Sequence, residues 1–369
     1  MTFFPSPLAT ADALHSSTEG LPREISLYCP FPESSYPGDV AALDEDAVGW
    51  CLRHRLFEPD DVSVRMGCGH GIADALPYAP ESTIAAATRH FYWGAAFDDY
   101  CDTHPDPMML AAEVGELHRV MDAAPAAAVP GGNRWVASLR ALRHELEAVL
   151  TDDEFAVFSR AHAMWLNGQL WFTALQERPT APRVEEWIRM RWAKSGVATL
   201  VPFTGSTCGI GALTARHRKD PAVRAFTEAV MMSCALLNDL ASAAKEIAAG
   251  TAVTNLLTVL AGPGDTTVDP VAAVELYERI VVLAYRLQQQ LLTDRRPEVA
   301  RYALELPRWI PAGIAWAGTT ARYHDLPTAD TVDGVAPQVS VTDIPTVWDP
   351  DDPTPPPYPE IAWWWEQLR

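Results

Sequence analysis

The chain has 369 residues, of which 48% are hydrophobic, and a formal net charge of −20 at pH 7. This length allows roughly one to three domains. The strong negative charge excludes a broad electrostatic attraction to nucleic acid or to an anionic membrane surface. It still allows a small anionic substrate, because a local group of cations or a bound metal reverses the field around it.

The six cysteines occur singly and form no C-x-x-C pair, so neither a disulfide framework nor a structural zinc site is indicated. The chain has no run of about 18 uninterrupted apolar residues. Its first residues show no basic segment followed by an apolar run, which a secretory signal would require. We therefore expect a cytoplasmic protein that binds no nucleic acid and does not insert into a membrane.

Helical signals follow one another along most of the chain. Pro80-Glu81-Ser82 begins a segment that we expect to be helical to about Asp102, and Thr103-His104-Pro105 ends it, since residues before a proline disfavour helix. We find no convincing run of alternating β-branched residues bounded by turns. The lengths and short connections favour an all-α bundle. Further helices are expected at residues 107–121, 134–149, 152–176, 183–194, 220–249, 251–261, 268–293, 296–306 and 311–323.

The composition changes after Leu326. Residues 327–369 contain nine prolines and eight acids with a single arginine, and they show no helical periodicity. Such a tail is expected to be extended or disordered. Its end, Ile361-Ala362-Trp363-Trp364-Trp365, is too apolar for an ordinary linker, so we expect it to dock on the body of the protein or to contact a partner.

Three aspartates, Asp98, Asp99 and Asp102, lie in the last turn of the first helical segment. Residues 98 and 102 share a helix face, so their carboxylates repel each other, and the C-terminal end of a helix disfavours anions as well. A hard cation such as Mg²⁺, which prefers oxygen ligands, would compensate this charge. On its own the short D-D-x-x-D pattern is equally compatible with a solvated acidic helix end.

A second polar cluster follows the apolar run 229–237. Asn238, Ser242 and Glu246 are spaced four residues apart, so they line one stripe of a helix and offer an amide, a hydroxyl and a carboxylate oxygen. Lys245 lies near this stripe and can reach a phosphate oxygen as a point charge. An ordinary amphipathic helix would rarely place this set after nine apolar residues, which favours a second metal-binding cluster.

Together the two clusters resemble the metal-binding pair of bacterial class I terpene synthases, D-D-x-x-D and N-D-x-x-S-x-x-x-E. Three further segments match the family in order and spacing. Tyr28-Cys29-Pro30-Phe31-Pro32 is similar to its N-terminal segment, Arg191 stands at the position of its pyrophosphate-sensing arginine, and Arg322-Tyr323 match its C-terminal Arg-Tyr pair. The resemblance implies a single isoprenoid-synthase helical bundle around a central apolar cavity, formed by residues 1–326, with residues 327–369 as a tail.

The resemblance also implies a reaction. A magnesium-dependent cyclase would ionise farnesyl diphosphate, cyclise the cation to a sesquiterpene and release diphosphate; the alternative is a diterpene synthase that uses geranylgeranyl diphosphate. A chain-elongating prenyl transferase would need a second aspartate-rich motif where this chain has Asn238 to Glu246. A non-catalytic isoprenoid-binding protein would tolerate missing metal ligands, yet none is missing. A homodimer is compatible with the family.

The family roles transfer to matching residues as follows. Three Mg²⁺ ions are implied, held by Asp98, Asp99 and Asp102 on one side and by Asn238, Ser242 and Glu246 on the other. The diphosphate would be clamped by Arg191, Lys245, Arg322 and Tyr323. Ser195, next to Gly196, would turn its carbonyl dipole toward the substrate. One position departs from the family: Lys194 stands where a small polar residue or aspartate is usual, which leaves its role open.

An ionised substrate needs an unreactive wall, and aromatic faces stabilise a passing cation. Trp316, two turns before Arg322, resembles a late aromatic residue that is common in the family, and Phe91 lies on the same segment as the first cluster. The full set of candidate wall residues is Phe91, Trp165, Trp171, Phe172, Trp309 and Trp316.

Overall fold

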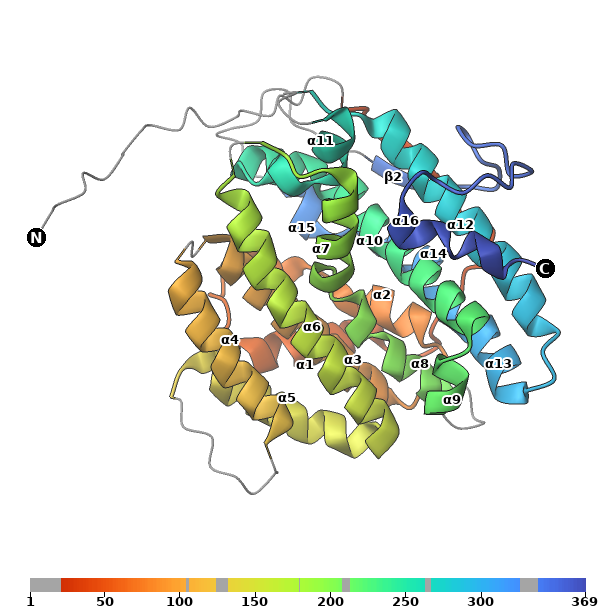
Figure 1. Cartoon of the computed structure of the whole chain (residues 1–369). Coiled ribbons are helices and arrows are strands. Elements are labelled where there is room, and N and C mark those ends of the chain that lie inside the picture. The colour runs from red at the N-terminus through yellow and green to blue at the C-terminus, as the bar shows by residue number, and fades with distance from the viewer. Residues whose placement is uncertain are drawn as a thin grey trace, which may run out of the picture.

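The protein is represented by a computed structural model that describes residues 21–103, 106–123, 132–178, 180–207, 213–262, 267–325 and 338–369. In this part of the chain, helices pack side by side into one bundle, as Figure 1 shows. The predicted all-α fold is therefore confirmed. Among the described helices the longest are α3 (Glu81–Thr103), α6 (Asp152–Gln176), α10 (Pro221–Ala249) and α12 (Pro270–Leu292).

Shorter helices complete the bundle. They are α1 (Val40–Arg53), α2 (Cys68–Ala75), α4 (Pro107–Asp122), α5 (Arg134–Val149), α7 (Val184–Lys194), α8 (Val201–Thr207), α9 (Ala215–Arg218), α11 (Leu256–Ala261), α13 (Pro297–Glu305), α14 (Trp309–Ala317), α15 (Ala321–His324) and α16 (Pro359–Ala362). Short 3₁₀ turns lie at Val62–Arg65, Val197–Thr199, Ala252–Thr254, Leu306–Arg308 and Trp365–Gln367. No described helix is both long and apolar enough to cross a membrane.

Local chemistry sets the ends of the two helices that matter most for the site. α6 begins with a capping box, in which the Thr151 hydroxyl and the Glu154 carboxylate satisfy each other's backbone N–H groups. α10 begins at Pro221 behind the Asp220 cap, because proline lacks the N–H that would go unpaired there. It ends at Gly250, which adopts the left-handed conformation (φ 72°) that glycine tolerates best.

The last predicted helix, 311–323, is wrong in its continuity. The structure has two helices there, α14 and α15, and they are separated by Gly318, Thr319 and Thr320. The Thr320 hydroxyl accepts a hydrogen bond from the backbone N–H of Arg322, so threonine caps a new helix instead of continuing the old one. Helices α1 and α2, which the sequence analysis did not predict, precede α3.

The structure also has two short strands, for which the sequence shows no convincing signal. β1 (Glu24–Tyr28) and β2 (Gln338–Thr342) pair in parallel, with Glu24 opposite Gln338. β2 belongs to the proline-rich tail. Its pairing with β1 therefore holds that part of the tail beside residues 24–28. A two-stranded pairing carries too little periodicity to be read from sequence.

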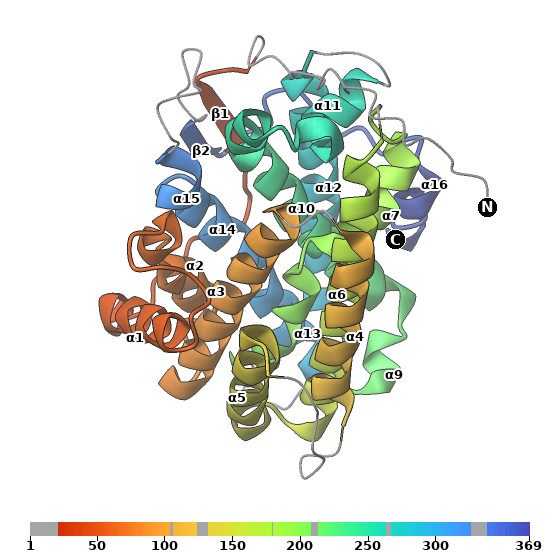
Figure 2. The same cartoon turned by 90° about the vertical axis from the view of Figure 1, so that its left-hand side faces the viewer.

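α10 lies in the middle of the bundle, as the two views in Figures 1 and 2 show. It packs against α12 and α14, while α6 packs against α7, and α2 packs against α14. This arrangement brings the acidic end of α3 and the polar stripe of α10 to the same end of the bundle, where the ε-ammonium of Lys245 reaches Asp99 at 3.0 Å.

Candidate active site

A cavity of about 190 Å³ opens between α2, α3, α6, α7, α10 and α14. Most of its wall is apolar, and two of its glycines lie beside large rings, Gly94 next to Trp165 and Gly71 next to Trp316. Charged and polar side chains gather in the same pocket: Asp98, Arg191, Lys194, Asn238, Arg322 and Tyr323. An apolar cavity with a few convergent polar groups is the usual form of a small-molecule binding site.

Four of the six aromatic candidates line this cavity, namely Phe91, Trp165, Trp309 and Trp316. The rings of Phe91 and Trp316 meet edge to face with centroids 5.3 Å apart. The Trp316 indole N–H donates to the Met66 carbonyl at 2.9 Å, which fixes the orientation of the ring. The pocket lining does not include Trp171 or Phe172, and Phe172 instead lies beneath the ε-ammonium of Lys194.

The three aspartates converge as their spacing predicts. One carboxylate oxygen from each of Asp98, Asp99 and Asp102 lies within 4.8 Å of the others. Asp102 Oδ1 is buried and has no hydrogen-bond partner, which is costly for a carboxylate unless another group binds there. Burial raises the pKa of Asp102, against the opposing effect of the Lys194 charge, and the Asp98 charge raises it further.

Cations from three other helices face these acids. The Lys194 ammonium (α7) lies 3.0 Å from Asp98 Oδ1. The Arg322 guanidinium (α15) pairs with both oxygens of Asp99, at 2.8 Å for one of them, and Lys245 (α10) lies 3.0 Å from the same carboxylate. Although burial opposes the charged form, Lys194 and Arg322 hold the pKa of Asp98 well below its usual range, and Arg322 and Lys245 lower that of Asp99.

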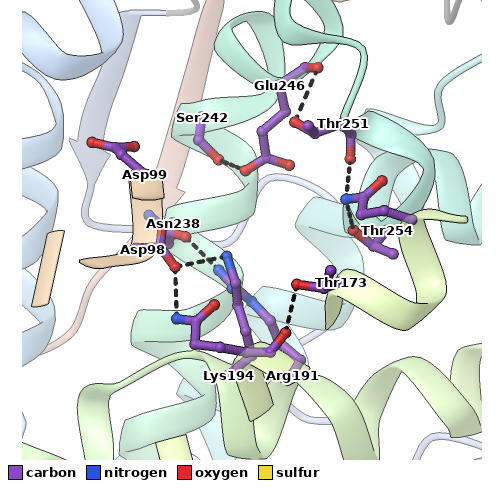
Figure 3. A network of polar contacts seen from close by, with 12 residues as sticks. Asp98, Asp99, Thr173, Arg191, Lys194, Asn238, Ser242, Glu246, Thr251 and Thr254 are labelled. Carbon is purple, nitrogen blue, oxygen red and sulfur yellow. Dashed lines mark hydrogen bonds and ion pairs between the residues drawn. The ribbon is translucent and has the colours of Figure 1, made fainter. Parts of the chain in front are cut away.

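The second cluster lies along α10. Ser242 Oγ donates to Glu246 Oε1 at 2.5 Å, and the other Glu246 oxygen accepts from Asn255 at 3.0 Å. The Asn238 side chain accepts from Arg191 and donates to the Tyr323 hydroxyl. Figure 3 shows Asp98, Lys194, Arg191 and Asn238 gathered together, with Ser242 and Glu246 further along α10.

Arg191 is almost fully buried, and it points toward α10. Its guanidinium lies 2.5 Å from Asp239 Oδ1 and donates to the Ala235 carbonyl at 3.1 Å. Asp239 also accepts from the backbone N–H of Leu256 at 2.8 Å, so it joins α7 to α10 and to the start of α11. Asp239 has no predicted role, although its place inside the N-D dipeptide was a usable signal.

The end of α7 forms part of the cavity wall. α7 ends at Lys194, and Gly196 adopts the left-handed conformation (φ 71°), which turns the chain so that Ser195, Gly196 and Val197 line the cavity. The Gly196 carbonyl accepts from both the backbone N–H and the hydroxyl of Thr199.

Two neighbouring residues of α6, neither of them predicted from the sequence, position the end of α7 and Asp98. A Cβ at Gly168 would lie 2.6 Å from the Lys194 backbone nitrogen, so only glycine lets α6 approach the end of α7 this closely. Gln169 donates to Asp98 Oδ1 at 2.8 Å. A glycine inside a long helix destabilises it, and this was the available sign of a close approach.

The donor set fits a hard divalent cation. Carboxylate, amide and hydroxyl oxygens are the ligands that Mg²⁺ takes in proteins. One oxygen of Asp102 lies near those of Asp98 and Asp99, and Asp102 Oδ1 is buried without a hydrogen-bond partner. Asp98, Asp99 and Asp102 would hold ions on the α3 side, whereas Asn238, Ser242 and Glu246 would hold one on the α10 side.

Comparison with known proteins places this geometry in a family. Residues 89–281 match the model of terpene synthase family 2, C-terminal metal binding. The chain is 27% identical to bonnadiene synthase of Allokutzneria albata over 92% of this chain and 96% of that protein. It is 26% identical to a (+)-T-muurolol synthase of Streptomyces clavuligerus, described as (2E,6E)-farnesyl diphosphate cyclizing, over 93% of this chain and 82% of that protein. A crystal structure of the SVS_A2 protein from ancestral sequence reconstruction superposes with a TM-score of 0.73 at 26% identity and covers 93% of this chain and 98% of that one.

Proposed function

Because the chain belongs to terpene synthase family 2 and is therefore a carbon–oxygen lyase, we propose that it ionises farnesyl diphosphate and cyclises the cation to a sesquiterpene. One observation carries this proposal: Arg191 and Arg322 line the aromatic-walled apolar cavity together with two of the proposed metal ligands, Asp98 and Asn238. The farnesyl chain length is supported by the T-muurolol synthase relative, whose name states that substrate.

The proposed metal is Mg²⁺, with three ions, which is the number that the resemblance to class I terpene synthases implies. When bound, Mg²⁺ would supply Lewis-acid neutralisation of the diphosphate oxygens as the carbon–oxygen bond breaks. The chain's own contribution is to hold the ligand oxygens at one end of the bundle. Gln169 orients Asp98 and Asn255 orients Glu246, so both carboxylates have fixed partners before any ion arrives.

Arg191, Lys245, Arg322 and Tyr323 would bind the diphosphate. In the structure Arg191 is held by Asp239 and Asn238, while Arg322 and Lys245 are held by Asp99. Diphosphate oxygens would replace Asp99 as the partner of the last two cations, which would free that carboxylate for metal. The Tyr323 hydroxyl already accepts a hydrogen bond from Asn238, and it would donate a hydrogen bond to the diphosphate.

After ionisation, the residues of the wall determine what happens to the cation. The faces of Phe91, Trp165 and Trp316 would each stabilise a nearby positive charge by roughly 0.5–2 kcal/mol. Ser195 lines the cavity beside the turn at Gly196, and its carbonyl dipole would add a fixed negative end at the wall. Closure of the polar pocket around diphosphate would exclude the water that otherwise captures the cation.

The test is incubation of the purified enzyme with Mg²⁺ and, separately, geranyl, farnesyl and geranylgeranyl diphosphate, followed by mass analysis of the hexane extract. We expect a cyclic fifteen-carbon product from farnesyl diphosphate. A cyclic product from geranylgeranyl diphosphate alone would replace the sesquiterpene assignment with a diterpene one. Release of only the linear alcohols, at the rate of a boiled control, would contradict the proposed reaction.

A further inference from the structure

Lysine is rare in this chain, and its positions are informative. The sequence contains three lysines, Lys194, Lys219 and Lys245, among 28 basic residues. Two of the three lie at the aspartate cluster. Lys219 is exposed and lies just before the start of α10, whereas Lys245 lies near the other end of that helix. A lysine carries a compact charge without the planar fork of arginine, so it suits a site where one carboxylate oxygen must be neutralised.

The surroundings of Lys194 leave its ammonium little freedom. The whole Lys194 residue is only 9% exposed. The ammonium lies 3.0 Å from Asp98 Oδ1 and 3.9 Å from the centre of the Phe172 ring, so it is confined between a carboxylate and an aromatic face. The close approach at Gly168 fixes the Lys194 backbone against α6.

The other two cations of the cluster pair mainly with Asp99, not with Asp98. The Lys245 side chain is 27% exposed, and Arg322 shares its guanidinium between Asp99 and, at 3.5 Å, Asp98. Both belong to the proposed diphosphate clamp and would exchange Asp99 for phosphate oxygens. Lys194 has no such role, so its charge stays beside Asp98 when the substrate arrives.

We propose that Lys194 is a fixed counter-ion of Asp98 that weakens divalent-cation binding to the substrate-free enzyme and makes metal uptake depend on diphosphate. The inference rests on the proposed function, because it assumes that Asp98 is a metal ligand. A positive charge so close to a ligand oxygen repels an incoming divalent cation in a partly buried site. Diphosphate supplies the negative charge that offsets this repulsion. Lys194 thus acts as a positioning residue through Asp98 and needs no contact with the reacting carbon atoms.

The test is calorimetric titration of Mg²⁺ into the substrate-free enzyme, repeated with saturating inorganic diphosphate after subtraction of a protein-free titration. The variants are Lys194→Met, Lys194→Arg and, as a matched control, Lys219→Met. Without diphosphate, Lys194→Met should bind Mg²⁺ at least tenfold more tightly than the wild type, or about 1.4 kcal/mol. Lys194→Arg and Lys219→Met should stay within about twofold of the wild type. The tightening caused by diphosphate should shrink in Lys194→Met by the same factor.

An Mg²⁺ affinity in Lys194→Met that equals or falls below that of the wild type overturns the inference, as does the same gain in Lys194→Arg. If circular dichroism shows that Lys194→Met is unfolded, Lys194→Gln takes its place with the same expected result. Failure of the wild type to bind Mg²⁺ even with diphosphate would instead overturn the metal assignment in the proposed function. The two failures are therefore distinguishable.

Discussion

Each cation of the proposed diphosphate clamp is paired within the protein before any substrate is present. Arg191 is held by Asp239, and Arg322 and Lys245 are held by Asp99. In the proposed clamp, substrate binding would therefore be an exchange of partners, and its free energy would be the difference between two charge-assisted interactions. Asn238 stands at the centre of this exchange, because it contacts both Arg191 and Tyr323.

Substitution of Asn238 with alanine should remove turnover while the bundle stays folded. The side chain is a proposed metal ligand at the cavity, and its loss leaves polar neighbours that can still reach other partners. We expect diphosphate release to fall at least a hundredfold, or about 2.7 kcal/mol of transition-state stabilisation. The measurement is a coupled diphosphate assay, with far-UV circular dichroism as the folding control. Turnover near the wild-type value would remove Asn238 from the metal site.

Asp98 requires a different test, because its removal leaves the buried Lys194 ammonium without the carboxylate that pairs with it. We expect Asp98→Ala to lower the free energy of unfolding by about 3–5 kcal/mol, the usual effect of breaking a buried ion pair. The double variant Asp98→Ala/Lys194→Met should regain most of that loss while remaining inactive. The measurement is urea denaturation of the wild type, the single variant and the double variant. Equal stability of the single and double variants would show that the pair is not energetically coupled.

At the scale of elements, the site depends on how closely α6 approaches the end of α7. Gly168 permits this approach, and the following residue, Gln169, orients Asp98. The chain break between α14 and α15 acts in a similar way, since the Thr320 cap starts the short helix that presents Arg322 and Tyr323. Both features interrupt or weaken regular helix in order to place functional groups.

Replacement of Gly168 with alanine should therefore disturb the site. The added Cβ would overlap the backbone at Lys194 and Ala193, so α6 and α7 must move apart. We expect a loss of about 1–3 kcal/mol in the free energy of unfolding, as for other overpacked positions, together with reduced turnover. Gly115→Ala on α4, where a Cβ meets nothing within 4 Å, is the matched control. That control should gain roughly 0.5–1 kcal/mol from helix propensity. Equal effects on both glycines would contradict the close approach.

At the scale of the whole molecule, the described part of the tail, residues 338–369, joins distant parts of the fold. β2 pairs with β1, and the Glu278 carboxylate on α12 accepts hydrogen bonds from the backbone of Thr346, Val347 and Trp348. Near the end of the chain, the Trp364 ring is 1% exposed, and its N–H donates to Glu228 on α10 at 2.9 Å. These contacts suggest that the tail docks on the bundle that carries the site.

Trp364→Ala tests this docking role against recruitment of a partner. Loss of a buried tryptophan should lower the free energy of unfolding by about 3–5 kcal/mol. The neighbouring Trp365, which is partly exposed, provides the control, and Trp365→Ala should cost far less. Chemical denaturation of both variants gives the answer. An unchanged stability in Trp364→Ala would favour a surface that binds another protein.

The sequence by itself determined most of the helices from α3 onward and the two oxygen-rich clusters, because both depend on local spacing. Residues four apart share a helix face wherever the helix lies, so Asn238, Ser242 and Glu246 could be grouped without a fold. Caps such as Asp220 and Thr151 set helix ends through the same short-range chemistry.

Only the tertiary structure decided which of these groups meet. The pairing of Lys194 with Asp98, the choice of Trp165 over Trp171 as cavity wall, and the role of Gly168 all depend on how α3, α6 and α7 pack. Packing angles and close approaches arise from contacts between residues far apart in sequence, and local periodicity carries no record of them. The sequence alone marked Lys194 as unusual. Its confinement beside Asp98 depends on such distant contacts and is therefore visible only in the folded chain.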